Sequence, residues 1–353
     1  MQFGLFGSAS ARRPTGADTA EFDSAEGFRD FIEYNVEAEA LGFRSTFVVE
    51  HHFTGYGQVS ATLNLLTWLG ARTTTLRLGT AVIVLPWHNP VLLAEQAATL
   101  DLLSGGRLDF GIGSGYRYNE FRGFCVDMDE AGARFDECLE VLVKAWTSNE
   151  PFSHRGTYWS FDNVIVDPPT TQRPTPPMWM GAGGESSVRR VAEKGYNLLL
   201  GQYAQPADLA KSIAAYRAAV EEQGRRFDPM SVGVTRAFFV CDDEAEKEEA
   251  LQRRLANRVR QLKLATRSDG TVQGGPDRAT GDPDTVNRGS AMYGTADEIA
   301  AKLDELREAG VGYVLINGGG SGGGARGRTS LRRFAREVMP HYMDERPADA
   351  ATV

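Results

Sequence analysis

The chain has 353 residues, of which 42% are hydrophobic and 24% charged, the balance of an ordinary globular protein with a large core. The formal net charge of -9 argues against a nucleic-acid or anionic-membrane partner, because either would require a positive surface field. Three cysteines without a CxxC spacing argue against a disulfide framework, and no stretch resembles a signal peptide or a membrane span, so we expect a cytoplasmic protein.

Short apolar runs of strand type alternate with helical periodicity along the whole chain. The expected strands are 2–6, 45–49, 76–85, 107–113, 177–181, 196–200, 231–240 and 311–317. The expected helices are 24–41, 60–71, 90–103, 130–146, 186–194, 206–223, 242–264, 295–309 and 330–342. Such alternation is typical of a parallel sheet covered by helices, and eight strands predict a closed (β/α)8 TIM barrel of α/β class. An open doubly wound sheet is the alternative, but no GxGxxG follows the first strand.

Two segments interrupt the alternation. Residues 149–177 are rich in aromatics and prolines, and a hairpin between 158–161 and 163–166 is expected there. Residues 265–294 are polar and nearly free of apolar side chains, which favours a mobile lid, with a disordered excursion as the alternative. The chain 1–353 is thus predicted to form a single barrel domain with two insertions.

Polar or glycine-rich groups follow the expected strands two to five. They lie at 50–52, 87–89, 114–117 and 183–186. Because residues after the carboxyl ends of barrel strands share one mouth, we expect these segments to converge on a single site. The glycine runs 111–115 and 180–187 could together hold a phosphate on backbone amides, although tight turns also need glycine.

The histidine pair at the end of strand two bears on metal binding and on proton transfer. His51 and His52 are adjacent, so on a strand they face opposite sides, which disfavours a metal site. A histidine beside Glu50 suits proton abstraction, whereas a buried histidine satisfied by the backbone is the structural alternative. We therefore expect a base here and no metal.

Four stretches resemble the bacterial luciferase-like family of flavin monooxygenases. They are EHHFTGYG (50–57), RLGTAVIVLPWHNP (77–90), LDLLSGGRLDFGIGSG (100–115) and NEFRGFCVDMDEAGARFDE (119–137). The resemblance extends over essentially the whole chain. It implies a barrel that binds reduced FMN and uses O2 to oxidise a small apolar substrate of the aldehyde or ketone class. It also implies a separate flavin reductase, because no nicotinamide-binding unit is visible.

The resemblance assigns roles to residues by position. His51 matches the catalytic base at the flavin face, and Glu50 and His52 flank it in the same motif. Ala81 and Val82 match a pair that lies against the flavin ring and is joined by a non-prolyl cis peptide, which we predict here. The other residues assigned to cofactor binding are Ser114, Tyr116, Gly183, Gly184, Ser186 and Ser187.

The chain departs from the family after strand four. Luciferases place a reactive cysteine and a phosphate-binding arginine there, where this chain has Gly113 and Ser114. Arg117 could supply the missing charge, and Arg288, in the lid segment, is a candidate to close over the phosphate. The expected substrate pocket is lined by Phe6, Tyr56, Trp87 and Trp179, although ordinary core packing is the more frequent role of any single aromatic.

Two other functions fit the same pattern. One is F420-dependent hydride transfer, and the other is a flavin-binding protein without catalysis. The expected helices 60–71 and 90–103 are more apolar than solvated helices should be, so a homodimer through them is predicted. No nucleic-acid or membrane partner is expected.

Overall fold

Eight parallel strands close into a barrel in the computed structural model, which describes residues 1–11, 23–272, 282–317 and 324–343. Each strand pairs in parallel with the next, and the last pairs with the first. Around the ring they are β1 (Gln2–Gly7), β2 (Ser45–Val48), β3 (Arg77–Thr80), β5 (Leu108–Gly113), β8 (Met178–Gly181), β9 (Asn197–Leu200), β10 (Val232–Val240) and β12 (Tyr313–Asn317). The predicted (β/α)8 barrel is confirmed.

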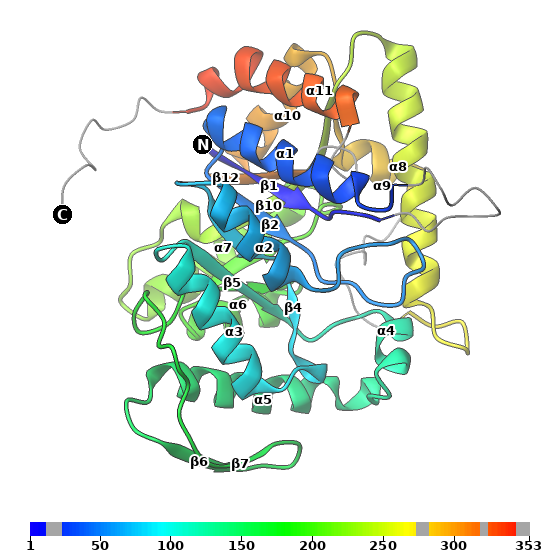
Figure 1. Cartoon of the computed structure of the whole chain (residues 1–353). Coiled ribbons are helices and arrows are strands. Elements are labelled where there is room, and N and C mark those ends of the chain that lie inside the picture. The colour runs from blue at the N-terminus through cyan, green and yellow to red at the C-terminus, as the bar shows by residue number, and fades with distance from the viewer. Residues whose placement is uncertain (12–22, 273–281, 318–323, 344–353) are drawn as a thin grey trace.

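Helices surround this barrel (Figure 1). They are α1 (Glu26–Ala40), α2 (Thr62–Arg72), α3 (Pro90–Leu103), α5 (Ala131–Thr147), α6 (Glu185–Glu193), α7 (Pro206–Glu222), α8 (Glu244–Ala265), α10 (Ala296–Glu308) and α11 (Gly324–Glu337). Their starts follow local chemistry: Asn89 caps α3 through its side chain, and Thr295 forms a capping box with Glu298 at α10. Short 3-10 helices lie at Leu85–Trp87, Met128–Glu130, Pro229–Ser231 and Met339–His341.

The two faces of each strand serve different layers. In β5 the side chains of Leu108, Phe110 and Ile112 belong to a buried cluster shared with α3 and α5, between the sheet and the helices. The alternate residues of the strands therefore face the barrel interior. Buried inside are Phe47, Trp179, Leu199, Tyr313 and Leu315.

The third predicted strand is interrupted. β3 ends at Thr80 and β4 (Ile83–Val84) begins after a break of two residues, so the expected single strand 76–85 is wrong in its middle. The intervening Ala81–Val82 peptide is cis, as predicted.

The insertion after α5 contains a hairpin, but not in the expected register. Its strands are β6 (Phe152–Arg155) and β7 (Ser160–Val164), so the expected strand at 158–161 begins in the turn. The physical reason is Glu137, whose carboxylate accepts hydrogen bonds from the amides of Thr157, Tyr158 and Trp159 and holds them as a tight loop.

Part of the predicted lid is regular structure. α9 (Pro283–Ser290) and β11 (Met292–Gly294) occupy its second half, and β11 pairs with the end of β10. The expectation of a loop without helix or strand is wrong for this half. Asp282 caps α9, but the helix has a single buried apolar residue, Val286, so its sequence shows no hydrophobic periodicity. Residues 273–281 of the lid lie outside the described residues. Helix α4 (Tyr118–Gly123), six residues long, was also not predicted.

Among the helices in the described ranges, none combines the length and apolarity needed to cross a membrane.

Candidate active site

The carboxyl end of the barrel carries a layer of small inward-facing residues. Gly113 and Gly181 are the last residues of the neighbouring strands β5 and β8, and Ala81, in the break between β3 and β4, packs against the interior cluster that contains Phe47 and Trp179. A side chain added at Gly181 would meet no atom within 4 Å, so the layer borders open space. One added at Gly113 would lie 2.6 Å from a Val82 methyl group, so Val82 occupies the room that a side chain after strand four would need.

Glu50 is a deeply buried carboxylate at this end of the barrel, with a side chain 1% exposed. Its Oε1 accepts hydrogen bonds from His52 Nε2 at 2.7 Å, His88 Nε2 at 2.9 Å and Trp87 Nε1 at 3.0 Å, and its Oε2 accepts one from the Val84 amide at 3.0 Å. Burial alone would raise the pKa of this carboxyl, but the hydrogen bonds from His52 and His88 outweigh it and lower the pKa to about 2. Glu50 is therefore an ionised anchor that ties the segment after β3 to the end of β2.

His51 takes a different partner. Its Nδ1 lies 3.0 Å from Oε1 of Glu120, a residue of α4 whose side chain is 2% exposed. The same Oε1 accepts the backbone N–H of His52 at 3.0 Å, so it serves as an acceptor and the proton of a neutral His51 resides on Nδ1. Among the described residues Nε2 has no hydrogen-bond partner, so its lone pair can take a proton.

The protonation equilibrium of His51 favours the neutral ring. Burial, followed by the positive charge of Arg117, lowers the pKa of His51, while Glu120 opposes the shift. A neutral histidine of fixed tautomer can act as a base near neutral pH.

Arg117 forms an ion pair with Glu120. It is 3% exposed, its Nη1 lies 3.7 Å from Glu120 Oε1 and 3.3 Å from Gln58 Oε1, and its Nη2 donates to Gln261 on α8. The positive charge of Arg117 is thus paired with the Glu120 carboxylate. A contact between Arg117 and a phosphate stays a prediction.

An aromatic wall flanks His52 and Trp87. Phe124 stacks on Trp87 with ring centres 5.0 Å apart and meets His52 edge-on at 4.7 Å, and Phe121 closes the other side of Trp87 at 5.2 Å. The predicted pocket residue Trp87 is therefore part of this wall, with its indole N–H held by Glu50.

Of the other predicted pocket residues, Phe6 packs against the interior cluster that contains Trp179, as do the predicted flavin contacts Ala81 and Val82. Tyr56 is 42% exposed on the loop after β2, under the guanidinium of Arg260, and is not part of that cluster.

The predicted phosphate loops lie at the ends of β5 and β8. Ser114 is exposed and Tyr116 half-buried. Gly183, Gly184 and Ser186 are exposed at the start of α6, where Ser187 Oγ accepts the Gly184 N–H and donates to its carbonyl. Exposed backbone amides at the start of a helix are suited to binding an anion. Phosphate binding at these loops stays a prediction.

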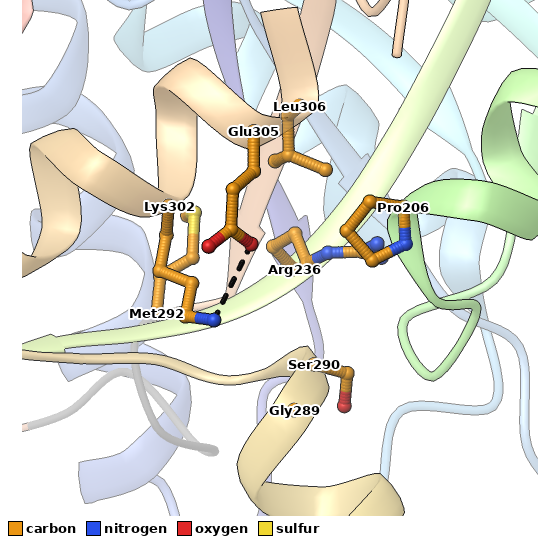
Figure 2. A pocket seen from close by; sticks show the side chains of 8 residues that line it. All are labelled: Pro206, Arg236, Gly289, Ser290, Met292, Lys302, Glu305 and Leu306. Carbon is orange, nitrogen blue, oxygen red and sulfur yellow. Dashed lines mark hydrogen bonds and ion pairs between the residues drawn. The ribbon is translucent and has the colours of Figure 1, made fainter. Parts of the chain in front are cut away.

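Arg288 lies away from these residues. On α9 it makes a bidentate ion pair with Glu248 and another with Asp284, both on the outer surface beside α8. Figure 2 shows a separate small pocket nearby, lined by Arg236, Ser290, Lys302 and Glu305, with the Lys302–Glu305 ion pair at its edge. None of the predicted site residues lines it.

Sequence reasoning missed Glu120, which a tertiary contact spanning 69 residues of chain brings to His51 and which no local spacing reveals. His88 belongs to the 87–89 group that was expected to converge with 50–52, and it meets Glu50 there. The weak signals were an arginine and a glutamate three residues apart, Arg117 and Glu120, in a short helix after β5. Within the described ranges, no group of histidine, cysteine and acidic side chains could hold a metal ion.

Comparisons with known proteins bear on the family and the fold. The sequence model of the luciferase-like monooxygenase family matches residues 1–312. The oxygenase component of a flavin-dependent trigonelline monooxygenase from Acinetobacter baylyi is 24% identical, covering 90% of this chain and 91% of that protein. The solved structure of monooxygenase RslO1 from Streptomyces bottropensis has a TM-score of 0.79 at 27% identity, covering 97% of this chain and all of that one (100%).

The same fold also serves another cofactor. A solved F420-dependent secondary alcohol dehydrogenase has a TM-score of 0.75 at 18% identity, covering 97% of this chain and 99% of that one, a likeness of fold alone. The family match covers most of the chain, and the barrel with a histidine at the end of β2 is the architecture that the resemblance implied. The chain belongs to the luciferase-like monooxygenase family.

Proposed function

We propose that this protein is the oxygenase component of a two-component flavin monooxygenase, using reduced FMN and O2 to oxidise a small organic substrate of the aldehyde or ketone class. A separate reductase would supply the reduced flavin. The observation that carries the proposal is a neutral histidine, fixed by a buried carboxylate, at the end of the barrel where Gly181 borders open space.

The residues present fit a flavin. The space next to Gly181 is open, and Ala81 and Val82 pack on the apolar cluster that contains Phe47 and Trp179, which suits a flat ring lying against this pair. The Trp179 indole N–H is buried there with no partner among the described residues, and a flavin ring carries acceptors that could take such a donor. Bound FMN would supply the oxygen chemistry, and the protein contributes position, exclusion of water and proton transfer.

His51 would serve as the base in this reaction. Its free Nε2 can accept a proton from flavin or substrate, while Glu120 keeps the ring in one tautomer and stabilises the imidazolium that results. Phe6 and Trp87 would line the substrate side of the mouth, while Ala81 and Val82 would lie against the flavin ring.

Cofactor identity is tested by titrating the purified protein with FMN and, separately, with F420, following fluorescence quenching. FMN should bind in the micromolar range or tighter, about tenfold or more tightly than F420. Oxygen uptake with reduced FMN should then rise on adding members of an aldehyde and ketone panel. Preferential binding of F420, with hydride transfer and no oxygen uptake, would replace this proposal with the F420-dependent function.

Replacing Glu120 with glutamine is expected to move the pH profile. The amide oxygen can still accept the Nδ1 proton, but the negative charge that raises the pKa of His51 is gone, so the acid limb of kcat/KM should move to lower pH. The rate at neutral pH should fall about tenfold or more because the base is weaker and the imidazolium less stabilised. The His51 imidazole pKa, followed by NMR in the flavin-free protein, should fall in parallel.

The matched control is Glu130→Gln, which removes an acid from the nearby surface pair with Arg134. An acid limb and His51 titration that stay unchanged in Glu120→Gln would remove Glu120 from the proton-transfer machinery.

We also propose a homodimer through α2 and α3. Large apolar side chains are exposed on these helices: Trp68 is 61% exposed, Leu92 52%, Leu102 51% and Leu103 66%. Apolar side chains gathered on neighbouring helices are typical of a protein–protein interface.

Trp68→Glu is expected to separate the subunits, since a buried charge would replace a large apolar contact. The dimer dissociation constant should rise about 30-fold or more, the effect of losing an interface tryptophan. Sedimentation equilibrium should show the mass of one 38.5 kDa chain where the parent shows two. Ile165→Glu, at an exposed apolar site in the insertion, is the control, and a monomeric parent protein would contradict the dimer.

A further inference from the structure

Helix α8 connects the loops on two sides of the barrel mouth. Its Gln261 accepts a hydrogen bond from Arg117, which pairs with Glu120 on the β5 side. Arg258, one turn earlier on the same face, meets Tyr203 in the loop after β9. α8 stands beside α9 and near α4 in Figure 1. The face that carries Arg258 therefore borders the space above the barrel.

Arg258 is a buried cation with too few partners. The residue is 4% exposed, and its one recorded hydrogen bond runs from Nη1 to the Pro283 carbonyl at 3.1 Å. Its Nε is buried without a partner, and no carboxylate of the described residues lies within ion-pair distance. Its guanidinium lies 4.4 Å from the centre of the Tyr203 ring. A guanidinium presents five donors, and a buried one is ordinarily paired with an anion.

Two further buried arginines, Arg254 and Arg236, add positive charge around the loop that carries Tyr203. Arg254 lies 4.5 Å from the same Tyr203 ring and donates to Asn287 and Ser290 of α9. Arg236, 2% exposed, donates to the carbonyls of Gly201 and Ala204 in the β9 loop. Burial, and then the charge of Arg254, lower the pKa of Arg236 to about 10, as expected where cations gather.

We propose that Arg258, with Arg254 and the Tyr203 ring, forms an oxyanion-binding subsite for a carboxylate or phosphate group on a molecule held in the barrel mouth. The proposal rests on the proposed function in that the mouth binds small molecules. Two sources share this chemistry: the phosphate of the flavin, and a carboxylate on the organic substrate. A planar guanidinium binds either group through two parallel hydrogen bonds.

The subsite is tested on the flavin-free protein by thermal unfolding with inorganic phosphate and with benzoate, at ionic strength matched with potassium chloride. The variants are Arg258→Gln and the control Arg253→Gln, which removes an exposed arginine of the same helix. At least one anion should raise the Tm of the parent and of Arg253→Gln. The affinity for that anion should fall about 30-fold or more in Arg258→Gln, the usual effect of losing one partner of a buried charge pair.

Stability without anion separates binding from a purely structural role. Because Arg258 is a buried cation without a counter-charge, Arg258→Gln should unfold at the same temperature as the parent or higher. A lower Tm together with an unchanged anion response would overturn the proposal. So would equal Tm increases in all three proteins, or no increase in the parent with either anion.

The source of the anion is identified by comparing FMN with riboflavin. If Arg258→Gln weakens the binding of FMN but leaves the binding of riboflavin unchanged, the subsite holds the flavin phosphate. If both flavins bind as in the parent while benzoate binding is lost, it holds a carboxylate of the substrate. A parent protein that responds to anions but binds no flavin would contradict the proposed function and leave the anion subsite standing.

Discussion

His51→Ala is expected to slow turnover by about 100-fold or more while leaving flavin affinity nearly unchanged. The reason is that His51 presents a free Nε2 to the site, whereas apolar packing and the loops after β5 and β8 account for the proposed flavin contacts. The measurement is single-turnover oxidation of reduced FMN with the best substrate of the aldehyde and ketone panel, beside a flavin titration.

His154→Ala is the matched control, because His154 pairs with Glu137 in the hairpin insertion, outside the barrel mouth. It should retain the parent rate. The pH profile adds an independent check: since burial and Arg117 lower the pKa of His51, the acid limb of the parent should lie below the usual histidine value of about 6.5. A His51→Ala enzyme with the parent rate would end the assignment of this residue as the base.

Glu50→Gln is expected to lower the free energy of unfolding by about 3 kcal/mol at pH 7, as for breaking a buried charge cluster from one side. Glutamine places an NH2 group among donors, and the N–H groups of His52, His88 and Trp87 lose the anion that they share. Urea unfolding at equilibrium measures the difference. Glu193→Gln, an exposed acid on α6, should change stability little.

The effect of Glu50 should depend on pH in a defined direction. Its pKa is lowered in the folded protein from 4.5 to about 2, so its stabilisation is fully present above pH 4.5 and is lost as the pH falls toward 2. The stability difference between the parent and Glu50→Gln should shrink over that range. A difference that stays constant would show that Glu50 is not the ionised anchor of this cluster.

Regular elements were predictable where they are long and repetitive. α3 begins and ends at the predicted residues, Pro90 and Leu103, because a capping asparagine, a first-turn proline and continuous apolar spacing all agree. α4 and α9 are six and eight residues long, and their stability comes from contacts with other elements, so their own sequences show little periodicity. The β6–β7 register depended on Glu137, a residue of α5.

The sequence by itself determined the barrel, the position of the histidine pair at the end of β2 and the family, because alternation of strands and helices and contiguous motifs are local properties of the chain. Only the tertiary structure decided which partner each histidine takes. Glu50 binds His52 and His88, whereas Glu120 binds His51, and the three elements involved are separated by tens of residues. The physical reason is that the protonation and tautomer of a buried histidine depend on the few atoms that surround it, and folding alone brings those atoms together.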